Sequence, residues 1–91
     1  MIVMILETVS PSLRGELTRW LLEPKAGVFV GRVSAMVRDR LWDRVCAGVG
    51  TGGAILIHSS DEEQGYSMRL YGETKRRLVD FEGLTLVQLP R

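Results

Sequence analysis

The amino-acid sequence predicts a single α+β domain, in which two helices cover one face of a β-sheet. With 91 residues the chain is long enough for one hydrophobic core and too short for two. Residues 1–6 and 54–57 are continuous apolar runs, as in strands that are buried on both faces. Two segments with apolar residues at helical spacing lie between these runs.

The first predicted element is a central strand over residues 1–6 that ends at Glu7. The point where a central strand leaves its sheet is a common place for a functional side chain. The simpler interpretation is that Glu7 is the first solvated residue after a core strand. On the residues alone, the simpler interpretation is favoured.

The second predicted element is an amphipathic helix over residues 12–23. Ser10 is its expected N-cap, and Pro11 occupies the first helical position, where a missing N–H costs nothing. Pro24 is expected to end the helix. Its buried stripe is predicted to consist of Leu13, Leu17, Trp20 and Leu21.

The middle of the chain predicts a short strand and a second helix. Residues 27–30 read as a strand that bends at Gly31. Ser34 is expected to cap the helix that follows, and a cluster of glycines over residues 48–53 ends it. The buried face of this helix is predicted to comprise Val37, Leu41, Trp42, Val45 and Val49.

Three strands are expected in the remainder: residues 54–57, a half-exposed strand over 66–71, and a last strand over 84–89. A basic connection over residues 72–77 precedes the last strand. Two short helices can cover only one face of such a sheet, yet its central strands are apolar on both faces. We therefore expect a homodimer in which two copies pack sheet against sheet about a two-fold axis.

Composition favours an ordinary globular protein rather than a strongly basic nucleic-acid binder. The net charge is +1 and 25% of the residues are charged. No apolar run approaches the ~20 residues needed to cross a bilayer. We see no basic leader and no second cysteine beside Cys46, so a cytoplasmic protein with a packed thiol and no membrane association is expected.

Charge is nevertheless sorted along the chain. Basic residues outnumber acidic ones over residues 14–44, and Lys75, Arg76 and Arg77 form a second basic cluster. Three adjacent cations repel one another, and a phosphate backbone relieves this repulsion with release of counterions. Arg14, in the first turn of a helix, adds to such a phosphate-binding surface. The alternative for the cluster is a solvated loop.

Catalytic and metal-binding patterns are weak. The single histidine, His58, ends an apolar strand and is expected to be structural. No cysteine–histidine spacing suits zinc, and the glycines at 48–53 follow a helix rather than a strand, which excludes a phosphate loop. A magnesium ion at Glu7 would require a two-fold axis that brings two copies of the carboxylate together.

Several blocks of the sequence resemble a known family. The run ETVSPSLRGELTRWLLEPKAGVFVGRVS, over residues 7–34, contains the blocks LRG, WLLE, AGV-aromatic-VG and VS. Trp42, the pair Tyr71 and Gly72, the basic residues after it, and the pattern Val79-Asp80-x-x-Gly83-Leu84 extend the match. Together these blocks resemble the small CRISPR-associated adaptation protein of the Cas-two family, in its type I-E form.

The resemblance implies a ferredoxin-like domain with an antiparallel sheet that forms a symmetric homodimer. In the family, this dimer is bridged by two dimers of the CRISPR integrase, and the assembly holds a short double-stranded prespacer DNA before insertion into the array. Residues 84–91 correspond to the segment that completes a sheet edge and docks against the integrase. The positions that match basic or polar contacts to the duplex backbone are Thr8, Arg14, Lys25, Arg38, Lys75 and Arg76, with Arg77 as an extra cation.

Three departures from the family pattern bear on function. Members with metal-dependent nuclease activity carry aspartate where this chain has Glu7, and magnesium geometry tolerates the longer side chain poorly. Ser12 replaces a basic residue expected in the first turn of the helix, so contacts to the duplex backbone are expected to be weaker there. The sequence stops at Arg91, so the integrase contact is expected to be shorter.

We therefore expect a non-catalytic, dimeric DNA-binding scaffold for spacer acquisition. Its enzyme rival is a magnesium-dependent endonuclease acting on RNA or duplex DNA, with Glu7 as catalytic and metal-binding residue. A third alternative is an interaction module without a nucleic-acid role.

Overall fold

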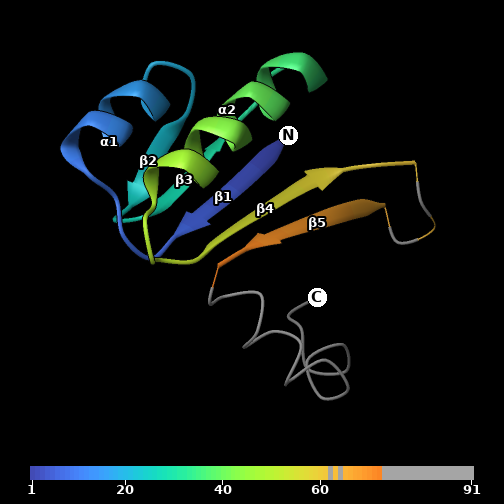
Figure 1. Ribbon diagram of the computed structural model, residues 1–91. Helices are drawn as coiled ribbons and strands as arrows, with labels where there is room; N and C mark the ends of the chain where they lie inside the picture. The colour runs from blue at the N-terminus through green and yellow to red at the C-terminus, as the bar shows by residue number, and fades with distance from the viewer. Residues whose placement is uncertain (62, 64, 73–91) are drawn as a thin grey trace.

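A computed structural model describes residues 1–61, 63 and 65–72, and within them the chain forms five strands and two helices (Figure 1). Along the sequence the elements are β1 (Ile2–Leu6), α1 (Pro11–Leu17), β2 (Leu22–Lys25), β3 (Val28–Gly31), α2 (Ala35–Gly48), β4 (Ala54–Ser59) and β5 (Tyr66–Tyr71). The strands form one sheet in the order β2-β3-β1-β4-β5, and all neighbouring pairs are antiparallel. The predicted last strand, residues 84–89, lies outside the described residues.

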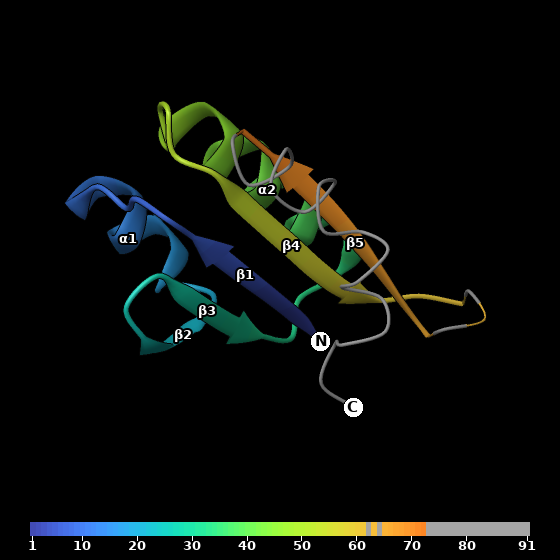
Figure 2. The ribbon, with the colours of Figure 1, turned by 90° about the horizontal axis from the view of Figure 1, so that it is seen from below.

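Both helices lie on the same face of the sheet. Figure 1 shows α1 and α2 side by side above the strands, and Figure 2, seen from below, shows the sheet in front of the helices. This arrangement confirms the predicted α+β class with two helices on one face, and it is compatible with the ferredoxin-like fold. None of the described helices is long and apolar enough to span a membrane.

The core lies between this helical layer and the sheet. Met4, in the centre of β1, pairs with Phe29 of β3 and Leu56 of β4, and all three side chains are fully buried. The helices contribute the predicted Leu13 and Leu17. They also contribute the buried residues Leu41, Trp42 and Val45, with Val49 directly after α2. Cys46 packs against this core, where burial raises the pKa of its thiol.

Serine caps begin both helices, as the sequence predicts. The side chain of Ser10 accepts a hydrogen bond from the amide of Leu13 at 3.1 Å, and Ser34 accepts one from Val37 at 3.2 Å. These bonds satisfy amides that have no partner inside the first turn. The caps therefore determine where both helices start.

The predicted end of the first helix is wrong. α1 ends at Leu17, and Leu22–Lys25, expected to be helical, forms the edge strand β2 paired with β3. A hairpin turn at Gly27, with φ +82°, joins the two strands, and Pro24 is tolerated because an edge strand leaves some amides unpaired. Leu21 is buried as predicted, but Trp20, predicted to be buried, is 54% exposed.

The second face of the sheet is apolar and carries none of the described helices. Strand alternation places Val3 and Ile5 of β1 there, opposite the buried Ile2 and Met4. The register aligns neighbouring strands with them, so that the same face also carries Val28, Val30, Ile55, Ile57, Met68 and Leu70. Apolar character on both faces, the basis of the homodimer prediction, is thus present; the homodimer itself stays a prediction.

Candidate nucleic-acid interface

Glu7 follows the last residue of β1 and is tied to the loop that precedes β4. Its Oε1 accepts a hydrogen bond from the amide of Gly53 at 3.1 Å, and its own amide donates to the carbonyl of Gly53 at 3.0 Å. The residue is exposed. The Glu7 carboxylate therefore links the end of β1 to the start of β4.

The described residues hold no group of three or more histidine, cysteine, aspartate or glutamate side chains that could bind a metal ion. Paired Glu7 carboxylates across a two-fold axis, and the endonuclease built on them, stay predictions.

At the end of the sheet near Glu7, several segments of the chain lie in close contact with one another. The amide of Leu6 donates to the carbonyl of Gly27 at 2.8 Å, which holds the β2–β3 turn against β1. A Cβ added to Gly52 would lie 2.9 Å from the hydroxyl of Thr8. A Cβ added to Gly72 would lie 2.7 Å from the carbonyl of Gly52, so the residue after β5 reaches the same end.

Two of the predicted DNA-binding residues are exposed at this end. Thr8 lies beside Gly52, and Lys25 ends β2, two residues before Gly27. Lys75, Arg76 and Arg77, which follow Gly72 in the sequence, lie outside the described residues.

Arg14, in α1, points to the same β2–β3 hairpin. Its Nε donates to both carboxylate oxygens of Glu23, at 2.9 and 3.1 Å. Glu23 also accepts a hydrogen bond from the amide of Gly27 at 3.0 Å. The Arg14 guanidinium, and next the Gly27 amide, hold the pKa of the Glu23 carboxyl below its usual value, so that the carboxylate is charged at neutral pH.

Arg38 does not join this group. It lies in the second turn of α2, where its Nε donates to Asp39 at 3.0 Å and one terminal nitrogen lies 3.3 Å from Nδ1 of His58. His58 pairs with Ile2, at the opposite end of β1 from Glu7. The Arg38 side chain is only 18% exposed. Its role in DNA binding stays a prediction.

His58, expected to be structural, lies within a polar network that joins α2 to β4 and β5. Its Nδ1 is 2.9 Å from the carbonyl of Ser59. Asp39 contacts Arg69 of β5 at 3.0 Å as well as Arg38. Hydrogen bonding to Arg38, above all, lowers the pKa of Asp39.

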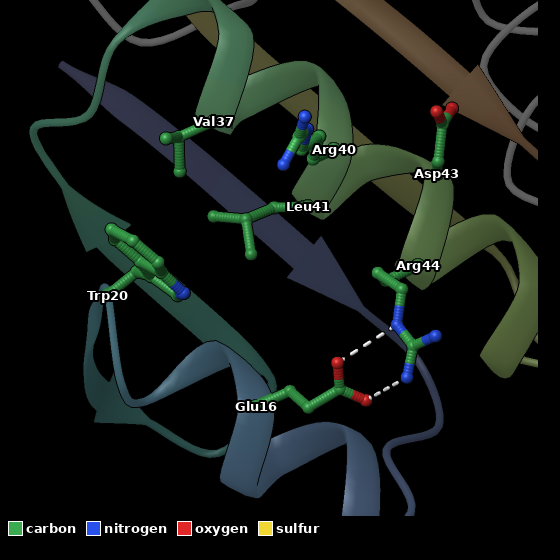
Figure 3. A pocket seen from close by; sticks show the side chains of 7 residues that line it. All are labelled: Glu16, Trp20, Val37, Arg40, Leu41, Asp43 and Arg44. Atoms are coloured by element: carbon green, nitrogen blue, oxygen red, sulfur yellow. Dashed lines mark hydrogen bonds and ion pairs between the residues drawn. The ribbon is translucent and has the colours of Figure 1, made fainter.

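A groove between the two helices was not anticipated from the sequence. Figure 3 shows this groove, which has a volume of about 430 Å³. Its lining comprises Glu16, Trp20, Val37, Arg40, Leu41, Asp43 and Arg44. Arg44 and Glu16 form a two-bonded ion pair across it, and Arg44 lowers the pKa of the Glu16 carboxyl. Charges of both signs line the groove.

Sequence reasoning also missed Glu23. Its partners are nine and four residues away, and the predicted helix over residues 12–23 would have placed it at a helix end. Helical and strand periodicity relate residues within one element, so they could not predict the contact between Arg14 of α1 and Glu23 of β2.

Comparison with protein families gives a match that spans nearly the whole chain. The model of a family described as "CRISPR-associated protein (Cas_Cas2CT1978)" matches residues 1–86. The match includes β1, both helices, the β2–β3 hairpin and the basic cluster at residues 75–77.

Proposed function

The chain belongs to the CRISPR-associated protein family Cas_Cas2CT1978, and on that premise we propose that it is a dimeric DNA-binding scaffold for spacer acquisition. In this proposal, which takes the chain as a type I-E member, two copies hold a prespacer duplex by its phosphates. The dimer bridges two integrase dimers and sets the distance between their active sites.

The observation that carries the proposal is the position of the basic and polar side chains at one end of the sheet. Thr8, Arg14 and Lys25 come from three different elements or loops, and Leu6, Gly27 and Glu23 connect them. Gly72 reaches the same end, immediately before the segment that carries Lys75, Arg76 and Arg77. A cluster of cations and a hydroxyl suits the phosphate backbone of a nucleic acid.

These side chains support binding that is independent of base sequence. Phosphate contacts fix the position of a duplex and carry no direct sequence information. A scaffold that must accept prespacers of any sequence needs this kind of contact.

The proposal is tested by replacing Lys75, Arg76 and Arg77 together with alanine and measuring affinity for a short duplex over a range of salt concentrations. We expect weaker binding and a shallower salt dependence, because the slope of log K against log salt changes by about 0.9 for each phosphate that the variant no longer neutralises.

The matched control removes the same number of cations from the helical face, by the combined substitutions Arg19→Ala, Arg40→Ala and Arg44→Ala. This control has the same net charge as the first variant and should keep most of the salt slope. Equal losses in the two variants would mean that only net charge matters, and an unchanged slope in the first would reject the scaffold.

A further inference from the structure

Glu23 pairs with one basic residue of the proposed interface, Arg14, and lies two positions before another, Lys25. Its carboxylate contacts Arg14 of α1 and the amide of Gly27, and Lys25 lies between Gly27 and Glu23 in the sequence. Its side chain is 14% exposed, whereas that of Arg14 is 41% exposed. The Glu23 side chain is therefore more buried than that of Arg14, part of which is at the surface.

The ion pair fixes the orientation of the Arg14 guanidinium without using all of its hydrogen-bond donors. Both hydrogen bonds to Glu23 come from Nε, on one side of the planar guanidinium. A guanidinium carries five N–H donors in a rigid fork, so its terminal nitrogens keep donors for a second anion. A freely rotating arginine would lose the entropy of several rotatable bonds on binding phosphate, and the pair with Glu23 removes part of that loss beforehand.

Simple electrostatics predicts the opposite effect. A carboxylate beside a phosphate-binding surface repels phosphate, so its removal should tighten duplex binding. Positioning and repulsion thus give effects of opposite sign, which makes the role of Glu23 decidable by experiment.

We propose that Glu23 is a positioning residue for the phosphate contacts of this protein: it orients the Arg14 guanidinium. The inference rests on the proposed DNA-binding function and adds a residue that does not itself touch the duplex. In this proposal, the gain in duplex affinity from orienting Arg14 is larger than the loss from repulsion between the Glu23 carboxylate and the phosphate.

The experiment compares duplex binding by Glu23→Gln and Glu16→Gln. Both substitutions remove one carboxylate from an arginine–glutamate pair, but the Glu16 pair lies in the groove between the helices. We expect Glu23→Gln to weaken binding about two- to tenfold, the range that corresponds to ordering one long side chain, whereas Glu16→Gln binds as the wild type or slightly tighter. Thermal melting of each variant, with Glu23→Asp as a charge-retaining variant, separates positioning from loss of folding.

The deciding measurement combines Glu23→Gln with Arg14→Ala. If Glu23 acts through Arg14, adding Glu23→Gln to Arg14→Ala lowers duplex affinity little further than Arg14→Ala alone. Tighter binding by Glu23→Gln, or an equal loss with and without Arg14, would overturn the inference while the alanine variant at residues 75–77 still tests the scaffold. Absence of duplex binding by the wild type would instead reject the proposed function itself.

Discussion

At the scale of single residues, close backbone contacts shape the end of the sheet where the proposed interface lies. Gly27 has φ +82°, and a Cβ there would lie 2.6 Å from the carbonyl oxygen of Leu6. Gly65 has a similar φ of +84°, but a Cβ there would meet nothing within 4 Å. The two glycines share a backbone conformation and differ in their surroundings.

We therefore expect Gly27→Ala to destabilise the protein more than Gly65→Ala. The left-handed conformation alone costs an alanine about 1–2 kcal/mol, which both variants incur. Gly27→Ala must also push the hairpin away from β1, which should bring its total to about 3 kcal/mol or more. Urea unfolding of both variants measures the difference, and equal midpoints would show that the contact with Leu6 relaxes without cost.

At the scale of elements, α1 is only seven residues long and is joined to its neighbours by ion pairs. Arg14 pairs with Glu23 of β2, and Glu16 pairs with Arg44 of α2. In each pair hydrogen bonding to the arginine, first of all, lowers the pKa of the glutamate below its usual value of 4.5. Because such a short helix has little stability of its own, its position depends mainly on the buried Leu13 and Leu17, and the two partly exposed ion pairs add little.

The lowered pKa values predict how stability depends on pH. A carboxyl whose pKa is lower in the folded state than in the unfolded state stabilises the fold above the unfolded pKa. This contribution is fully present above about pH 4.5 and is lost as pH falls through the lower, folded values. We expect the melting temperature to decrease below that pH.

The control for this acid effect is the combined variant Glu16→Gln and Glu23→Gln. It should show a shallower decrease, because it lacks both titrating groups. An identical pH profile for the variant and the wild type would assign acid sensitivity to other carboxyls. Both pairs are partly exposed, so high salt should also reduce the difference.

At the scale of the whole molecule, the sheet presents two unlike faces. One face lies against both helices, as Figures 1 and 2 show. The side chains of this face contribute to the buried core. The other face carries apolar side chains on the four strands β3, β1, β4 and β5, with Ile5 in a central position between Val28 and Ile55. An apolar face of this kind is what the predicted homodimer requires.

The homodimer prediction is tested at Ile5, which is 37% exposed in the single chain. The substitution Ile5→Lys should shift a dimer toward monomer, because an interface between two sheets would bury two unpaired charges. Sedimentation velocity measures the shift. Met36→Lys, on the helical side and 64% exposed, is the control and should leave the dimer intact. A wild-type protein that sediments as a monomer would contradict the prediction.

Local pattern was sufficient for most of the fold and for the start of each helix. The apolar run of β1, the helical spacing from Val37 to Val49 and the cap serines are signals within one element, and each is confirmed. Leu17 and Leu21 were also correctly predicted to be buried. The helix predicted through them was too long. Leu17 and Leu21 can be buried either by one continuous helix or by a shorter helix that is followed by a turn and a strand, so their burial does not distinguish the two.

By itself, then, the sequence determined most of the buried side chains, that the sheet has helices on one side, and which family the chain resembles. Tertiary structure alone decided that residues 22–25 pair with β3, that Trp20 is exposed, and that Arg14 and Lys25 share one end of the sheet while Arg38 lies at the other. The physical reason is range. Burial follows the local period of the chain, whereas edge pairing and ion pairs such as Arg14–Glu23 and Arg44–Glu16 form between residues that only folding brings together.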